Sequence, residues 1–177
     1  MDPTKNEPEM HTIYLGLGTN SGDRAANLEA AIQALPPQVE VQERSPIYQT
    51  PPWGYTNQPD FLNLVLEART QLTPPQLLKF LKSLEDQVGR TATFRWGPRE
   101  IDIDILLYDD LVLETDELVI PHPQMQARAF VLVPLADLAP NLVHPKLKQT
   151  NTDLLEQVDT TAIQTYHPET PSDGKAV

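Results

Sequence analysis

The sequence has no cysteine, which excludes a disulfide scaffold, a thiol nucleophile and any zinc or iron–sulfur site built on thiolates. It has no run of about 20 apolar residues, so no membrane-spanning helix is predicted. Residues 1–11 lack the apolar core of a signal peptide. Basic side chains are scarce, with 13 against 25 acidic ones and a net charge of -12, which argues against a protein that mainly binds nucleic acid or membranes. We therefore expect a cytoplasmic protein with neither kind of partner.

The 177 residues, 40% of them hydrophobic, are enough for a single domain with a sizeable core. Half of the net charge lies in the two ends of the chain, which are rich in Pro, Thr and acidic residues and poor in large apolar ones. Such composition favours disorder. We therefore expect a flexible N-terminal tail at 1–11, a folded domain at 12–148 and a largely disordered acidic C-terminal tail at 149–177.

Strand and helix patterns alternate between the tails. The predicted elements are a strand at 13–17, a helix between residues 23 and 36, a strand from residue 39, a strand at 61–69, a helix between residues 73 and 89 and a strand at 100–108. A hairpin within 111–120 and a proline-interrupted helical region near 127–138 follow. The βαββαβ order is the ferredoxin-like plan, an α+β fold whose antiparallel sheet carries both helices on one face. The opposite face is then open to ligands.

Two carboxylates on the last strand, Asp102 and Asp104, carry the clearest chemical pattern. Their Cα atoms are about 6.6 Å apart in an extended strand, so their oxygens can converge on one or two divalent ions. Such oxygen ligands favour magnesium, which also takes phosphate oxygens. The alternative is the polar face of an amphipathic strand, since the apolar residues on the expected opposite face are Ile101, Ile103, Ile105 and Leu107.

The segment before this strand is rich in arginine: Arg90, Arg95 and Arg99 are three of the seven in the chain. The guanidinium fork matches phosphate oxygens, and arginines that face a carboxylate–metal strand suit phosphoryl transfer. Trp96 in the same segment can stack on a heteroaromatic ring. The alternative is a solvated loop whose arginines pair with surface acids.

Weaker patterns indicate a pocket for a flat, hydrogen-bonding ring. Phe61 and Asn63 share a strand face, where an aromatic ring beside an amide can stack on a heterocycle and bind its edge. Trp53 follows two prolines, and His122 is held between two others. Each of these residues also fits an ordinary structural role. The glycines at 16 and 18 lack the Lys of a Walker A loop and instead allow a close backbone approach.

Six ordered segments together resemble the 6-hydroxymethyl-7,8-dihydropterin pyrophosphokinase family of folate biosynthesis. The most specific is Arg95-Trp-Gly-Pro-Arg99 followed by Asp102-Ile-Asp104. The others are Tyr14–Asn20, Tyr48–Pro52, Gln58–Asn63, Pro121-His122 and Arg128–Phe130. The resemblance covers about residues 12–147.

The resemblance implies a ferredoxin-like fold and transfer of the β,γ-diphosphate of ATP to the pterin hydroxymethyl oxygen, with release of AMP. It implies that Asp102 and Asp104 bind two Mg²⁺ ions and act in catalysis together with Arg90, Arg95 and Arg99. The residues implied for the pterin are Thr50, Pro51, Trp53, Phe61, Asn63, Trp96 and Phe130. Those implied for ATP are Glu85, Arg90, Arg95, Trp96, Arg99, Ile105, His122 and Arg128.

Three positions depart from the family pattern. Ala92 and Glu117 stand where some relatives have arginine, which bears on the ATP contacts and not on the reaction, and Trp53 stands where a leucine can occur. One alternative function is another magnesium-dependent nucleotide transferase that uses the Asp-x-Asp pair. A ferredoxin-like RNA-binding module is disfavoured, because its sheet face should be basic and this strand carries Glu100, Asp102 and Asp104. We expect a monomer, with a dimer left open.

Overall fold

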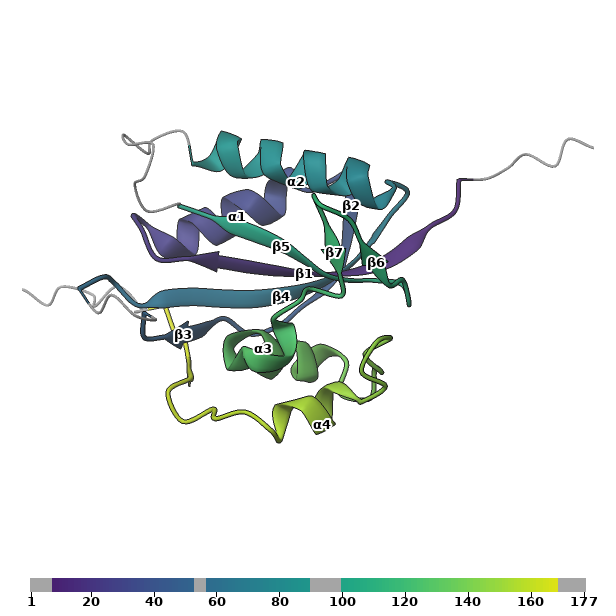
Figure 1. Ribbon diagram of the computed structural model, residues 1–177. Coiled ribbons are helices and arrows are strands. Elements are labelled where there is room, and N and C mark those ends of the chain that lie inside the picture. The colour runs from purple at the N-terminus through teal and green to yellow at the C-terminus, as the bar shows by residue number, and fades with distance from the viewer. Residues whose placement is uncertain (1–7, 53–56, 90–99, 169–177) are drawn as a thin grey trace, which may run out of the picture.

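A six-stranded antiparallel sheet forms the centre of the computed structural model, which describes residues 8–52, 57–89 and 100–168. Its strands lie in the order β5-β1-β4-β3-β8, and β2 pairs with β4 beside β3 (Figure 1). Their bounds are β1 His11–Thr19, β2 Val39–Arg44, β3 Tyr48–Thr50, β4 Phe61–Thr70, β5 Asp102–Tyr108 and β8 Gln164–Thr165. This strand order confirms the predicted ferredoxin-like fold.

Two short strands pair along one edge of β4: β2, which begins at residue 39 as predicted, and β3, which was not predicted. β2 pairs with residues 66–70 of β4, and β3 pairs with residues 61–63. Ser45 lies between β2 and β3: its N–H donates to the carbonyl of Val65 at 2.9 Å, and its Oγ accepts from the Val65 N–H at 2.9 Å. Ser45 therefore keeps both backbone groups of Val65 hydrogen-bonded between the two strands.

Both predicted helices, α1 (Arg24–Ala34) and α2 (Pro74–Val88), lie on the same face of the sheet (Figure 1). Asp23 caps α1 by accepting from the Ala26 N–H at 3.1 Å. The helix α2 starts after Thr73, as the Thr-Pro sequence predicts, and Thr73 forms a capping box with Gln76 there. The core between the helices and the sheet contains Ile13, Leu15, Leu17, Leu28, Leu62, Leu64, Leu66, Leu77, Leu81 and Ile103.

The other face of the sheet is partly covered by α3 (Ala129–Leu138), which follows the hairpin of β6 (Leu113–Glu114) and β7 (Val119–Ile120) and the short helix η1 (Met125–Ala127). Pro134 lies inside α3, which confirms the predicted proline-interrupted helix. The antiparallel pairing of β6 with β7 confirms the predicted hairpin. A second apolar cluster joins α3 to the sheet through Tyr14, Val65, Leu106, Met125 and Leu135.

The prediction that Leu107 shares a strand face with Ile103 and Ile105 is wrong. Leu15 pairs with Ile105 and Tyr14 pairs with Leu107, so Leu106 is an extra residue in β5. A bulge of this kind shifts the alternation by one residue. Leu107 therefore lies in the cluster beneath α3, whereas Ile103 and Ile105 lie in the core beneath α1 and α2.

The expectation of a largely disordered tail at 149–177 is wrong for its described part. A helix, α4 (Asn151–Leu155), and the strand β8 lie within it. Thr150 and Asp153 form a capping box on α4, and Leu154 is buried. This segment contains few apolar residues, but apolar side chains such as that of Leu154 are packed against the rest of the domain. Residues 1–7 and 169–177 lie outside the described part of the chain. Among the described residues, no helix is long and apolar enough to cross a membrane.

Candidate functional site

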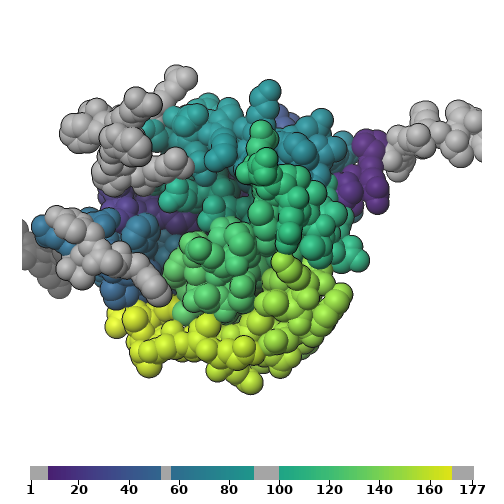
Figure 2. Space-filling model, viewed as in Figure 1, coloured from purple at the N-terminus to yellow at the C-terminus, as the bar shows by residue number. Residues whose placement is uncertain are grey.

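A cavity of about 530 Å³ lies on the open face of the sheet, between the strands and α3. Figure 2 shows the molecule hollowed beside the surface of α3. Residues from β1, β3, β4, β5, η1 and α3 line the cavity, so segments far apart in the sequence meet there. Such convergence of polar groups in a concave, mostly apolar site is typical of small-molecule binding.

Two glycines of β1 form part of the cavity floor. Gly18 pairs with Asp102 and Gly16 with Asp104 across the strands. A Cβ atom on Gly18 would lie 2.8 Å from Oδ1 of Asn63, closer than a carbon and an oxygen can approach without a shift. A Cβ atom on Gly16 would meet the side chain of Leu106 at 3.4 Å. The glycines therefore leave room above the sheet at the two positions beside the carboxylates.

Asp102 and Asp104 both line the cavity, as the alternation along β5 predicts. The Asp104 side chain is exposed and Asp102 is half-buried. Between them, the Ile103 N–H donates to Oε1 of Glu85 on α2 at 2.8 Å. This bond satisfies a backbone donor of the strand and fixes β5 against α2 where it carries the two carboxylates.

An amide and a hydroxyl are paired on the neighbouring strands. Asn63 on β4 donates from Nδ2 to Oγ1 of Thr50 on β3 at 3.2 Å, and each residue is only 7% exposed. This bond determines which way the Asn63 amide points. Phe61, two residues earlier on β4, lies on the same side and also lines the cavity. The group offers a ring surface next to fixed polar atoms.

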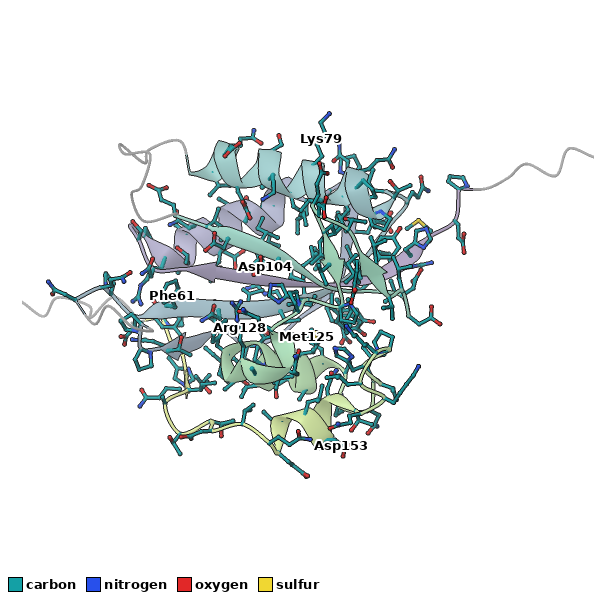
Figure 3. All side chains as sticks on the ribbon, viewed as in Figure 1. Phe61, Lys79, Asp104, Met125, Arg128 and Asp153 are labelled. Atoms are coloured by element: carbon teal, nitrogen blue, oxygen red, sulfur yellow. The ribbon has the colours of Figure 1, made fainter. Side chains whose placement is uncertain are left out.

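A cationic side chain, that of Arg128, approaches from the α3 side. Arg128 donates from Nη2 to Oε1 of Gln124 at 2.5 Å, and its Cζ lies 5.6 Å from the ring centroid of Phe130. Figure 3 shows Arg128 and Asp104 near the middle of the site, with Phe61 towards one end of the sheet. A guanidinium held in this way has donors left for phosphate oxygens.

His122 lies next to this group. Burial lowers the pKa of His122, and the charge of Arg128 lowers it further, against the opposing effect of Asp104. Its Nδ1 accepts from the Gln124 N–H at 3.2 Å, so the neutral ring carries its proton on Nε2. At neutral pH His122 is therefore an uncharged donor.

The cavity is lined by eight of the predicted site residues: Thr50, Pro51, Phe61, Asn63, Asp102, Asp104, Arg128 and Phe130. Five others lie outside the described residues, together with Ala92: Trp53, Arg90, Arg95, Trp96 and Arg99. Glu85, Ile105 and His122 are not among the described residues of the cavity wall. The Ile105 side chain lies in the core and is 5% exposed, because the alternation that directs Asp104 outward directs Ile105 inward. Only its backbone can contact a nucleotide.

Gln124 lines the cavity and positions Arg128, and sequence reasoning missed it. The two residues flank the three-residue helix η1, so their contact depends on the geometry of that turn, which the sequence does not reveal. Leu106 and Val131, also part of the wall, were missed because their place depends on the β5 bulge and on how α3 crosses the sheet.

The donor set fits magnesium. Among the described residues, no cluster of three or more His, Asp or Glu side chains could hold a metal by itself. Magnesium is usually held by one or two carboxylates, with waters and substrate phosphates as the remaining ligands. Asp102 and Asp104 on an open cavity supply that pair, with space for the phosphates beside them.

Residues 14–140 match the family model described as 7,8-dihydro-6-hydroxymethylpterin-pyrophosphokinase. The chain is 48% identical over 136 residues to a 2-amino-4-hydroxy-6-hydroxymethyldihydropteridine pyrophosphokinase of Aquifex aeolicus, which covers 77% of this chain and 85% of that one. A protein of the same name from Synechocystis is 42% identical over 170 residues, covering 95% and 87%.

Among solved structures, the chain resembles Plasmodium falciparum HPPK-DHPS, wild type with STZ-DHP, with a TM-score of 0.69 and 17% identity. The likeness covers 86% of this chain and 44% of that one, so this chain spans less than half of the solved chain's length. At this level of identity it bears on the fold alone.

Proposed function

This chain belongs to the 7,8-dihydro-6-hydroxymethylpterin-pyrophosphokinase family, and we propose that it transfers the β,γ-diphosphate of ATP to the hydroxymethyl oxygen of 6-hydroxymethyl-7,8-dihydropterin. The products are the pterin diphosphate and AMP, and the reaction is a step of folate biosynthesis. ATP and the reduced pterin are the partners of this reaction. The prediction of a cytoplasmic monomer, with a dimer left open, belongs to the same proposal.

The observation that carries this proposal is the meeting of three kinds of group around one cavity. Asn63, Thr50 and Phe61 offer a ring surface and fixed hydrogen-bonding groups for the pterin. Asp102 and Asp104 offer two carboxylates for the magnesium that ATP carries. The guanidinium of Arg128 faces the same space and suits the phosphates.

The reaction forms a bond between the pterin hydroxymethyl oxygen and the β-phosphorus of ATP. The bond from the β-phosphorus to the α,β-bridging oxygen breaks, AMP leaves with the electron pair, and the alcohol proton passes to water. Bound magnesium neutralises phosphate charge in such reactions. The chain itself positions the two substrates: Asn63 holds the pterin edge, while Arg128 and the neutral Nε2–H of His122 donate to phosphate oxygens.

Mass spectrometry of the protein incubated with ATP, magnesium and 6-hydroxymethyl-7,8-dihydropterin tests the proposal. AMP and pterin diphosphate should appear together in equal amounts. ADP in place of AMP, or turnover that does not depend on the pterin, would instead support the alternative of another Asp-x-Asp nucleotide transferase. The Asp104→Asn variant should lose turnover while it stays folded. Asp110→Asn is the matched control, because Asp110 is an exposed carboxylate just beyond β5 that does not line the cavity.

A further inference from the structure

Residues 150–166 lie beyond residue 140, where the match to the family model ends, yet they contact both walls of the cavity. We refer to them as the C-terminal brace. Figure 1 shows α4 against α3, after which the chain turns back to the sheet and lies beside β3 as β8. The brace therefore joins the element that covers the cavity to the strand that borders it.

The first contact of the brace is with the C-terminal end of α3. Asn151 is fully buried and donates from Nδ2 to the carbonyl of Ala139, the residue that caps α3, at 2.8 Å. The Asn151 N–H donates to the carbonyl of Leu142 at 3.0 Å. Leu154 of α4 is also buried. These contacts hold α3, whose Phe130 lines the cavity.

The second contact is with β3, which has only three residues. Thr165 pairs with Tyr48 and Gln164 with Gln49, and the Tyr166 N–H donates to the carbonyl of Ile47 at 2.8 Å. A short strand with a neighbour on one side only is prone to fraying. The brace gives β3 a second neighbour and so stabilises the strand that carries Thr50.

The ring of Tyr166 extends this contact to the start of β4. The Cζ of Arg24 lies 5.9 Å from its centroid, and Nη1 of Arg24 donates to the carbonyl of Asp60 at 2.8 Å. The carboxylate of Asp60 accepts from Nε2 of Gln49 on β3 at 2.8 Å. Tyr166 thus packs against a set of groups that spans α1, β3 and the residue just before Phe61.

We infer that the C-terminal brace positions Thr50 and, through its hydrogen bond, the Asn63 amide for binding of the pterin. This inference rests on the proposed function, and it makes Tyr166 a positioning residue at a distance from the substrate. If β3 frays, Oγ1 of Thr50 no longer fixes Nδ2 of Asn63, and the amide can rotate. The pterin then binds to a site that becomes ordered only on binding, and the free-energy cost of this ordering lowers the affinity for the pterin.

Steady-state kinetics of three full-length variants test the inference. Tyr166→Pro removes both the N–H that bonds to Ile47 and the aromatic ring, and we expect the KM for the pterin to rise about tenfold, the effect of roughly one hydrogen bond and one ring contact. The KM for ATP and kcat should stay unchanged. Tyr166→Phe keeps the backbone donor and the ring and should restore the wild-type KM. His167→Pro is the matched control, an exposed position one residue further along the chain.

Amide hydrogen exchange gives a second readout that does not need turnover. Residues 47–50 should exchange faster in Tyr166→Pro than in the wild type or in His167→Pro, while β1 exchanges as before. Unchanged exchange at 47–50 would overturn the inference. So would equal rises in both KM values with a lower melting temperature, since that is a general loss of stability. If the wild type makes no pterin diphosphate, the proposed function fails, and exchange still decides whether the brace orders β3.

Discussion

Replacing Gly18 by alanine should disturb pterin binding specifically, because the added methyl group meets one atom of the site. Its Cβ would lie 2.8 Å from Oδ1 of Asn63, and β1 is fixed between β4 and β5, so the side chain of Asn63 must move. Asn63 is 7% exposed and is held by Thr50 at 3.2 Å. Rotation of the amide breaks that bond and leaves buried polar groups unpaired.

The size of the effect follows from that hydrogen bond. A buried polar group left without its partner costs about 1–3 kcal/mol. This range corresponds to a roughly 5- to 150-fold loss in kcat/KM for the pterin. The KM for ATP should change little. Gly16→Ala is the comparison variant: its Cβ would meet the flexible end of Leu106 at 3.4 Å and not Asn63, so its effect should not depend on the Asn63 amide.

A double-mutant cycle in the same kinetic assay gives the decisive result. In the Asn63→Ala background the oxygen that Gly18→Ala would meet is absent, so the second substitution should cost almost nothing. The coupling between the two positions should then equal most of the Gly18→Ala effect. If Gly18→Ala costs the same factor with and without the Asn63 amide, the contact at 2.8 Å is not the cause and the reasoning is refuted.

Three further predictions concern the parts that support the site. Glu85→Ala removes the acceptor of the Ile103 N–H and should lower kcat roughly tenfold. Glu85→Gln keeps an acceptor oxygen, so its kcat should stay near that of the wild type. Equal losses of kcat in the two variants would contradict this role of Glu85. Leu154→Ala should lower the free energy of unfolding in urea by about 2–4 kcal/mol, and a negligible change would contradict its burial. Burial and the charge of Lys146 lower the pKa of His144, so the folded state favours the neutral ring. The free energy of unfolding should therefore fall as pH drops below about 6.5, the unfolded value, and level off below the folded pKa; His144→Gln should lose that part of the slope, and an unchanged slope would refute the assignment.

The sequence predicts those features of the fold that depend on local periodicity and capping. The start of α2 follows from Thr73, whose hydroxyl caps the helix, and from Pro74, whose fixed φ and missing N–H suit the first helical position. The face on which Asp102 and Asp104 lie follows from the alternation of β5 before its bulge. Such features need no knowledge of neighbouring segments.

Features that depend on contacts between distant segments could not be predicted. Leu107 changes face because Leu106 is inserted opposite β1, and the register of two strands decides that. The segment at 150–166 is ordered although its composition is polar, because Leu154 and Tyr166 find partners on α3, β3 and α1. A prediction from composition averages over all residues of a segment, so it misses a segment that becomes ordered through the contacts of a few residues.

The two glycines of β1 favour the proposed metal-binding interpretation of the Asp-x-Asp pattern over that of a solvated strand face. Glycine inside a strand costs about 0.5–1 kcal/mol relative to alanine, and β1 carries two of them in the middle of the sheet. A polar strand face that merely meets water gains nothing from this cost. Gly16 and Gly18 are the cross-strand neighbours of Asp104 and Asp102, so the space that they leave lies beside the carboxylates. In the function that we propose, a ligand held by these carboxylates would use that space, while the contact with Asn63 also favours glycine at position 18.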